Sequence, residues 1–359
     1  MATTILDRPA GPRPTAVRPV VAPLVFVLVL VLAGYEGPGM DHFAPLPEAR
    51  PVTDAHLLRK VPITDFPAAT VVATTPPAPV AVQPAPGPVG TKWLPSGKGM
   101  WIYVPDKTEG GNVDAIVAKA KAVGLTHVWV RMGSAWDGFN VVPFVNRLLP
   151  AAHAAGIKVI GWDFPKLDPW EADVQRALTM IRHRAPGGHR IDAFSADIET
   201  RAEGTRISPE AARTYGAALR AGAGEHYPLI ATVPRPSKER ASFPYADVVA
   251  GYDAIAPMVY WLNRQPDTDV AGALRDLAQF GKPVYPVGQA YDGSREGGRK
   301  GVPPPEELFR FIKTAETHGA AGVSFWSWQA ANQPAWDAIR DAPEFRPAAS
   351  PVRPEKYGN

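Results

Sequence analysis

Eight strand-then-helix units between residues 99 and 345 constrain the fold of this chain more than any other feature. The predicted strands are β-branched runs at residues 100–104, 126–132, 158–163, 191–199, 229–233, 254–260, 284–289 and 322–326. Helical patterns, with apolar residues at spacings of three and four, cover residues 113–123, 141–155, 169–183, 209–223, 270–280, 304–318 and 334–340. The segment 237–249 is expected to be mostly loop. Such alternation is typical of parallel βαβ architecture.

The number of units and their total length distinguish between two parallel architectures. Residues 99–345 amount to 247 positions, and about 250 residues is the usual size of a (β/α)8 barrel. The alternative is a doubly wound open sheet, but no Gly-rich phosphate turn follows the first strand. We therefore predict the α/β class and a (β/α)8 TIM barrel over residues 99–345.

The N-terminal part of the chain has the order of an export signal. Residues 1–18 form a basic region with three arginines, and residues 19–35 form an uncharged hydrophobic segment. The apolar run 20–35 would span about 24 Å as a helix, which is shorter than the roughly 30 Å hydrocarbon layer. Val31 and Ala33 suit a signal peptidase and favour a cleaved signal peptide. A signal anchor is the alternative.

Residues 36–98 are expected to be an extended linker. Residues 1–98 contain 18 of the 41 prolines, several of them in the runs 74–79 and 83–90, and such runs favour a polyproline-like chain that buries no core. Residues 346–359 form a C-terminal tail. The expected location is extracellular or in the cell envelope, either secreted or anchored by a single N-terminal transmembrane helix.

Composition excludes several classes of function. Of the net charge of +3, the first 98 residues carry +2, and no Lys/Arg-rich run with interleaved aromatics follows them, so we expect no nucleic-acid partner. Cysteine is absent, and the eight histidines show no HExxH spacing. A Ser-hydrolase elbow and a P-loop are also missing. We expect a monomer without metal or cofactor.

The fourth predicted strand, residues 191–199, ends in two carboxylates on one face. Alternation along the strand places Asp197 and Glu199 on the face opposite Phe194 and Ala196, so both should point into the barrel at its catalytic end. Their Cα atoms would lie about 6.6 Å apart. At this separation one charge raises the pKa of the other group and can keep a general acid protonated. An acidic surface loop is the alternative interpretation.

The same strand resembles the motif of chitinase-like glycoside hydrolases of family 18, D-x-x-D-x-D-x-E. Asp192, Asp197 and Glu199 match three of its four acids, and Ser195 replaces the fourth. The resemblance implies that Glu199 is the acid/base and that Asp197 orients the N-acetyl group of the substrate, whose carbonyl acts as nucleophile. The departure at Ser195 leaves the N-acetyl requirement open.

Two other strand ends extend the resemblance. Met258 and Tyr260 match the family's Met-x-Tyr, whose tyrosine donates to the reacting acetamide. Trp326 stands where the family places a tryptophan beneath the sugar. The resemblance covers the barrel only, and it implies a polysaccharide substrate.

Three more polar residues end predicted strands. Arg131 should project into the barrel mouth, either to contact substrate or to pair with a carboxylate there without a catalytic part. Asp163 is the candidate for a second catalytic carboxylate if Asp197 is not one. Gln289 suits sugar hydroxyls, and a hydrogen bond to a neighbouring loop is its alternative role.

Aromatic residues gather at the same strand ends, where their faces would suit the apolar faces of pyranose rings. They are Trp136, Phe139, Trp162, Tyr260, Trp261, Tyr291, Trp326 and Trp328. Trp162 and Trp261 have the alternation of residues that pack against helices, which is the alternative role for these two.

The sequence therefore predicts an exported glycoside hydrolase that acts on a cell-wall or other polysaccharide. The expected catalytic residues are Glu199, Asp197, Tyr260 and Asp163. The expected substrate-binding residues are Arg131, Asp192, Met258, Gln289, Tyr291, Trp326, Trp328 and Trp136. A catalytically inactive carbohydrate-binding barrel is the alternative. An uncleaved N-terminal segment would also make the membrane a partner.

Overall fold

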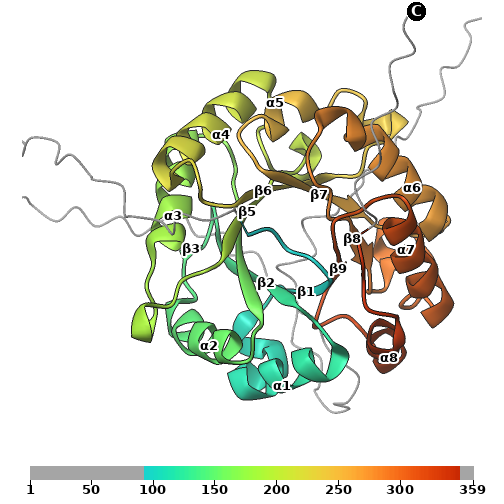
Figure 1. Cartoon of the computed structure of the whole chain (residues 1–359). Coiled ribbons are helices and arrows are strands. Elements are labelled where there is room, and N and C mark those ends of the chain that lie inside the picture. The colour runs from blue at the N-terminus through green and yellow to red at the C-terminus, as the bar shows by residue number, and fades with distance from the viewer. Residues whose placement is uncertain (1–92, 348–359) are drawn as a thin grey trace, which may run out of the picture. The chain divides into compact units, whose positions relative to one another are not determined.

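Eight parallel strands close into a barrel in the computed structural model, which describes residues 93–347 (Figure 1). The strands are β1 (Lys98–Ile102), β2 (His127–Ser134), β4 (Lys158–Phe164), β5 (Ala193–Asp197), β6 (Leu229–Pro234), β7 (Ala254–Val259), β8 (Val287–Gln289) and β9 (Val323–Trp326). They pair in chain order, and β1 closes the ring by pairing with both β2 and β9. The short β3 (Gly138–Phe139) adds an antiparallel edge to β2.

One helix follows each parallel strand, and Figure 1 shows these helices as a ring around the sheet. They are α1 (Val113–Val123), α2 (Val142–Ala154), α3 (Trp170–Arg182), α4 (Pro209–Ala223), α5 (Tyr245–Val249), α6 (Pro266–Leu277), α7 (Pro305–Thr317) and α8 (Gln333–Asp341). The predicted (β/α)8 barrel is therefore confirmed. The fifth helix has only five residues, in keeping with the weak pattern after the fifth strand.

Local sequence signals explain where helices begin. Ser208 accepts a hydrogen bond from the Ala211 backbone nitrogen, and Pro209 occupies the first helical position of α4. Asn112 caps α1 in the same way. Because each cap satisfies backbone donors that lack a partner inside the helix, it fixes the start of the helix and the length of the loop above the barrel.

Aromatic side chains fill the interior of the barrel. The rings of Trp101 and Trp129 stack with centroids 4.5 Å apart, and Trp162 lies beside them. Trp93 and Leu94 pack against this interior cluster, so folded structure begins before the expected barrel boundary at residue 99. A second apolar layer lies between the sheet and the helices.

The N-terminal predictions concern residues that the structure mostly does not describe. The basic region and the hydrophobic segment lie within residues 1–92, as does the linker up to residue 92, and nearly all of the tail lies within residues 348–359. Within residues 93–347, no helix has the length and apolar character needed to cross a membrane.

Candidate functional site

The end of β5 carries the central acidic residues. Phe194, Ala196 and Ile198 belong to the layer between the sheet and the helices, so Asp197 and Glu199 point to the barrel interior, as predicted. The extended backbone continues past the strand, because the Ile198 amide donates to the Thr232 carbonyl at 2.9 Å.

Ser195 lies one step below Asp197 on the same face of β5. Its hydroxyl donates to the Ile230 carbonyl at 3.2 Å and shares a hydrogen bond with the Thr232 hydroxyl at 2.8 Å. Both contacts join β5 to β6. The Ser195 hydroxyl is therefore occupied by the barrel wall beneath the acids.

Asp197 is buried without a full set of hydrogen bonds. Its side chain is 8% exposed, and its Oδ1 has no hydrogen-bond partner among the described residues. Burial, followed by the charges of Glu203 and Asp163, raises the pKa of Asp197 to about 7, and Arg131 opposes this shift. A carboxyl group with this pKa exchanges protons near neutral pH.

Glu199 is also 8% exposed, and a third acid, Glu203, lies against it. Burial and the charges of Glu203 and Asp197 raise the pKa of Glu199 well above its usual range. Glu203 is the last residue of the 3-10 turn Arg201–Glu203, and it forms a capping box with Thr200. The spacing T-x-x-E is a recognised sequence signal for such a turn, so this residue could have been found from the sequence.

Two tyrosines that follow β7 and β8 lie near these acids. The rings of Tyr260 and Tyr291 meet edge to face with centroids 5.3 Å apart, and the Tyr291 hydroxyl donates to Glu296 Oε2 at 2.6 Å. Burial and the charges of Asp197 and Glu199 raise the pKa of Tyr260 well above its usual range. Tyr260 therefore stays a neutral hydrogen-bond donor. Met258 shares its face of β7.

An aromatic wall lies across the mouth from the acids. The centroid of Trp326 lies 5.4 Å from Tyr103, 5.7 Å from Trp162 and 5.8 Å from Trp101. Trp162 thus faces the interior and not the helices. Tyr103 is a further member that the sequence reasoning missed, although it shares the alternation of Trp101 at the end of the first strand.

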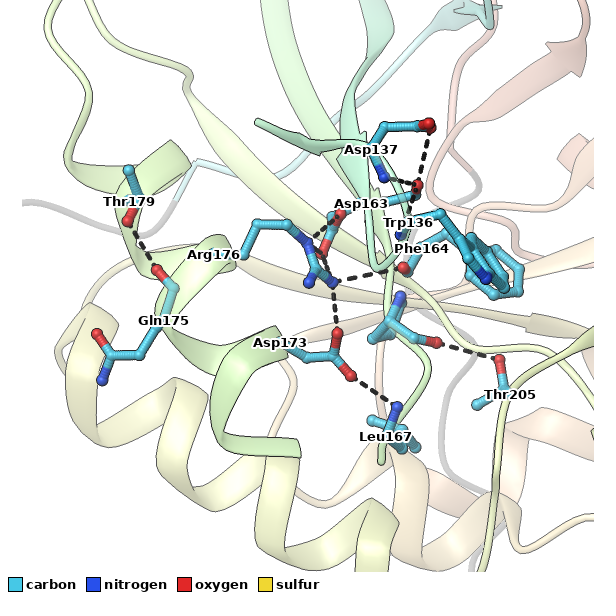
Figure 2. Close-up of polar contacts among 12 residues, drawn as sticks. Trp136, Asp137, Asp163, Phe164, Leu167, Asp173, Gln175, Arg176, Thr179 and Thr205 are labelled. Carbon is cyan, nitrogen blue, oxygen red and sulfur yellow. Dashed lines mark hydrogen bonds and ion pairs between the residues drawn. The ribbon is translucent and has the colours of Figure 1, made fainter. Parts of the chain in front are cut away.

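The end of β2 and the turn that follows it form the rim of this wall. The Arg131 guanidinium lies 5.1 Å above the Tyr103 ring and forms an ion pair with Asp137. Trp136 is 55% exposed, and its ring centroid lies 5.0 Å from that of Phe164 (Figure 2). Arg131 therefore lies beside the aromatic wall and pairs with a carboxylate, which is one of its two predicted roles, and its contact with substrate stays a prediction.

Asp163 lies at the end of β4 on the face that is turned to α3, because Trp162 occupies the interior, so the structure does not support Asp163 as the second catalytic carboxylate. Its fully buried carboxylate accepts from Arg176 Nε at 3.0 Å and from Nη2 at 2.8 Å, and Arg176 lies on α3 (Figure 2). Arg176 also donates to Asp173 at 2.6 Å. Both faces of a barrel strand are buried, so alternation alone does not identify the inner face.

Asp192 lies at the opposite end of the barrel from the other motif acids. Its carboxylate accepts from Lys158 Nζ and from the Val159 amide, each at 2.9 Å, and His153 Nε2 lies 2.9 Å away. Asp192 is the residue just before β5, and these contacts connect the start of that strand to β4 and α2. The structure thus separates Asp192 from Glu199.

Three further predicted residues make contacts within the barrel, and Gln289 has its alternative role of a hydrogen bond to a neighbouring loop. The Gln289 amide accepts from the Leu262 backbone nitrogen at 2.8 Å and donates to the Tyr291 carbonyl at 3.1 Å. Trp328 is 3% exposed, packs against Trp336 of α8 and donates to Glu109 at 2.9 Å. Trp261 packs against α7, where its indole donates to Glu307 at 2.7 Å.

The site therefore combines proton-exchanging carboxyl groups, neutral phenol donors and an aromatic wall. Such a set can protonate a leaving oxygen and stabilise the positive charge that develops on the carbon from which this oxygen departs. Within residues 93–347, no group of three or more His, Asp or Glu side chains is arranged to hold a metal ion.

Comparison with known proteins gives matches through structure only. No protein-family model matches the chain, and no curated protein matches its sequence. An endo-1,4-beta-mannanase from Rhizomucor miehei superposes with a TM-score of 0.50 at 10% identity, over 65% of this chain and 86% of the mannanase.

Two bacterial structures match at the same TM-score of 0.50 and 12% identity. A putative alpha-L-fucosidase from Bacteroides thetaiotaomicron covers 74% of this chain and 99% of its own. The C-terminal domain of a putative chitinase from Desulfitobacterium hafniense covers 68% of this chain and 98% of its own. At this identity the likenesses establish the (β/α)8 barrel fold.

Proposed function

We propose that this protein is a glycosidase that hydrolyses a polysaccharide with Glu199 as general acid. The observation that carries the proposal is the burial of Glu199 beside Asp197 and Glu203 at the barrel mouth, which holds a proton on a carboxyl group. A general acid needs such a proton near neutral pH to protonate a leaving oxygen.

The neighbouring groups fit the remaining chemistry. Asp197, whose Oδ1 has no hydrogen-bond partner within residues 93–347, can stabilise the oxocarbenium-like charge or assist its nucleophile. Tyr260 stays protonated beside it and can donate to the reacting sugar. Asp163 takes no part, because its carboxylate is held by Arg176.

The aromatic wall supports a carbohydrate as the substrate class. Trp326 and Tyr103 offer partly exposed rings above the barrel interior, and Trp136 extends this surface at the rim. Aromatic faces bury the C–H surface of a sugar without competing for its hydroxyls. The mannanase that shares the fold supports the same class.

The proposal is tested by hydrolysis of chitin, chitosan, peptidoglycan, mannan and cellulose by wild type and by Glu199→Gln. The variant should lose at least about 100-fold in rate, because general acid catalysis contributes about 10²–10⁴-fold, and it should still bind the polysaccharide. Glu225→Gln removes an exposed carboxylate in the loop after α4 and should retain wild-type rates.

Two outcomes oppose the proposal in different ways. Hydrolysis by Glu199→Gln at the wild-type rate would remove Glu199 from the mechanism. A wild-type protein that is retained on insoluble polysaccharide but releases no sugar from any member of the panel would identify a binding protein. The aromatic wall, which does not depend on the acids, favours this second function as the alternative.

We also propose that the barrel acts outside the cytoplasm, joined to its export segment by the Pro-rich linker. The basic residues 1–18, the apolar run 20–35 and the proline-rich stretch that follows support this location. Cell fractionation with an antibody to the barrel tests it. Recovery in the medium or in the membrane fraction would distinguish a cleaved signal from an anchor, and recovery only in the cytoplasm would contradict export.

A further inference from the structure

We propose that Glu203 is a positioning residue that keeps the catalytic proton on Glu199. This inference rests on the proposed function and adds a residue from the loop after β5 to the acid machinery. The starting observation is that two buried acids lie together just past the end of β5, where Glu199 is 8% exposed and Glu203 is 5% exposed. Two neighbouring carboxyl groups that are shielded from water do not both ionise easily, because their negative charges repel each other.

The contacts of Glu203 identify it as the ionised partner. Its Oε2 accepts from the Thr200 backbone nitrogen at 3.1 Å and from the Thr200 hydroxyl at 2.7 Å. Arg240 Nη2 lies 4.0 Å from its Oε1. Hydrogen bonds to the charged form and a nearby cation both favour a carboxylate, so the capping box that shapes the turn also holds a negative charge in place.

Glu199 has no comparable support for a negative charge. Its backbone nitrogen donates to the Thr205 hydroxyl at 3.2 Å, which fixes the residue, and no donor among residues 93–347 forms a hydrogen bond to its carboxyl group. The titratable and charged groups that act on Glu199 are Asp197, Glu203, Arg240, Tyr245, Tyr260 and Tyr291. Two of these groups are acids and only one, Arg240, is a cation. The surrounding charges therefore favour the protonated form of Glu199.

The proton then follows a balanced path through the reaction. Glu199 gives its proton to the glycosidic oxygen as the bond from that oxygen to the anomeric carbon breaks, and the bonding electrons stay on the oxygen. Two adjacent carboxylates remain, and their repulsion makes Glu199 a stronger base. Glu199 is thereby prepared to take a proton from a water molecule as the oxygen of that water bonds to the anomeric carbon, which returns Glu199 to its starting state.

The test measures the titration of the Glu199 side-chain carboxyl by ¹³C NMR in the full chain, with its resonance assigned by its loss in Glu199→Gln. In Glu203→Gln the amide can still accept from Thr200 and can donate to Glu199. The Glu199 titration should therefore move to lower pH by about one unit or more. The alkaline limb of the hydrolysis profile should move with it.

Two controls separate this role from simple capping of the turn. Thr200→Val removes one hydrogen bond to Glu203 but leaves its charge, so it should lower thermal stability without the downward shift of the Glu199 titration. Glu225→Gln should change neither quantity. If Glu203 acts only as a cap, Glu203→Gln will also lower stability and leave the Glu199 titration where it is in wild type.

The wild-type protein provides a second test that needs no folded variant at Glu203. Its Glu199 carboxyl, assigned through backbone-connected spectra, should titrate well above the usual range of a glutamate and respond to the ionisation of a second acid. Titration in the usual range with a single step would overturn the inference. A shifted titration without any hydrolysis would instead leave the inference intact and contradict the proposed function.

Discussion

At the scale of single residues, Asp197 combines burial with an unsatisfied carboxylate oxygen, and this has a thermodynamic consequence. An ordinary aspartate has a pKa of about 3.9 in an unfolded chain, whereas burial and nearby acids raise the pKa of Asp197 to about 7 in the fold. Between these two values the folded protein binds more protons than the unfolded chain. The free energy of unfolding therefore falls as pH rises through this window.

Asp197→Asn removes the titrating group, so the free energy of unfolding of the variant should no longer fall with pH for this reason. The melting temperature of the variant relative to wild type should increase between pH 5 and pH 8, because wild type pays for a buried charge only at the higher pH. Thermal unfolding followed by circular dichroism at both values checks this. Asp114→Asn, at an exposed position in the first turn of α1, should give a difference that does not depend on pH in this way.

At the scale of elements, the link between β4 and α3 depends on one arginine with two buried carboxylate partners. Arg176 contacts Asp163 and Asp173, and all three side chains are largely buried (Figure 2). Arg176→Met should lower the free energy of unfolding by about 3–5 kcal/mol, because both carboxylates lose their cation. Arg213→Met breaks an exposed pair with Asp247 and should cost less than about 1 kcal/mol. Equal costs in urea unfolding would contradict this assignment.

Two glycines make a second prediction at this scale. A Cβ at Gly99 on β1 would meet the ring of His127, which is fully buried, so Gly99→Ala should destabilise the barrel by about 1–3 kcal/mol. Gly272 on α6 has only the end of the Arg275 side chain nearby. Gly272→Ala should stabilise the protein by about 0.5–1 kcal/mol, because alanine favours the helix. Urea unfolding should thus give changes of opposite sign.

At the scale of the whole molecule, alternation of strands and helices predicted the barrel and the chain order of its units. It also placed Asp197 and Glu199 inside, because an outward-facing layer of Phe194, Ala196 and Ile198 marks the other face of β5. The same reasoning failed for β4, where Trp162 faces the interior and Asp163 faces α3. Tryptophans fill the interior, so both faces of this strand are apolar and alternation does not tell them apart.

Contacts between loops were harder to predict from the chain. Glu203 comes to Glu199 through a turn whose capping signal was overlooked. The separation of Asp192 from Glu199 follows from geometry, because residues at opposite ends of one strand share a motif without sharing a site. Sequence spacing thus describes positions along an element, whereas the site depends on which ends of different elements meet.

The central claim is that Glu199 gives a proton to a glycosidic oxygen, and a crystal structure of Glu199→Gln with a bound oligosaccharide tests it most directly. The oligosaccharide is the one that wild type cleaves or, if none is cleaved, the one that it retains. The side chain at position 199 should lie about 2.6–3.2 Å from a glycosidic oxygen, with a sugar ring against Trp326. A sugar bound across the mouth with no glycosidic oxygen within reach of position 199 would contradict the claim.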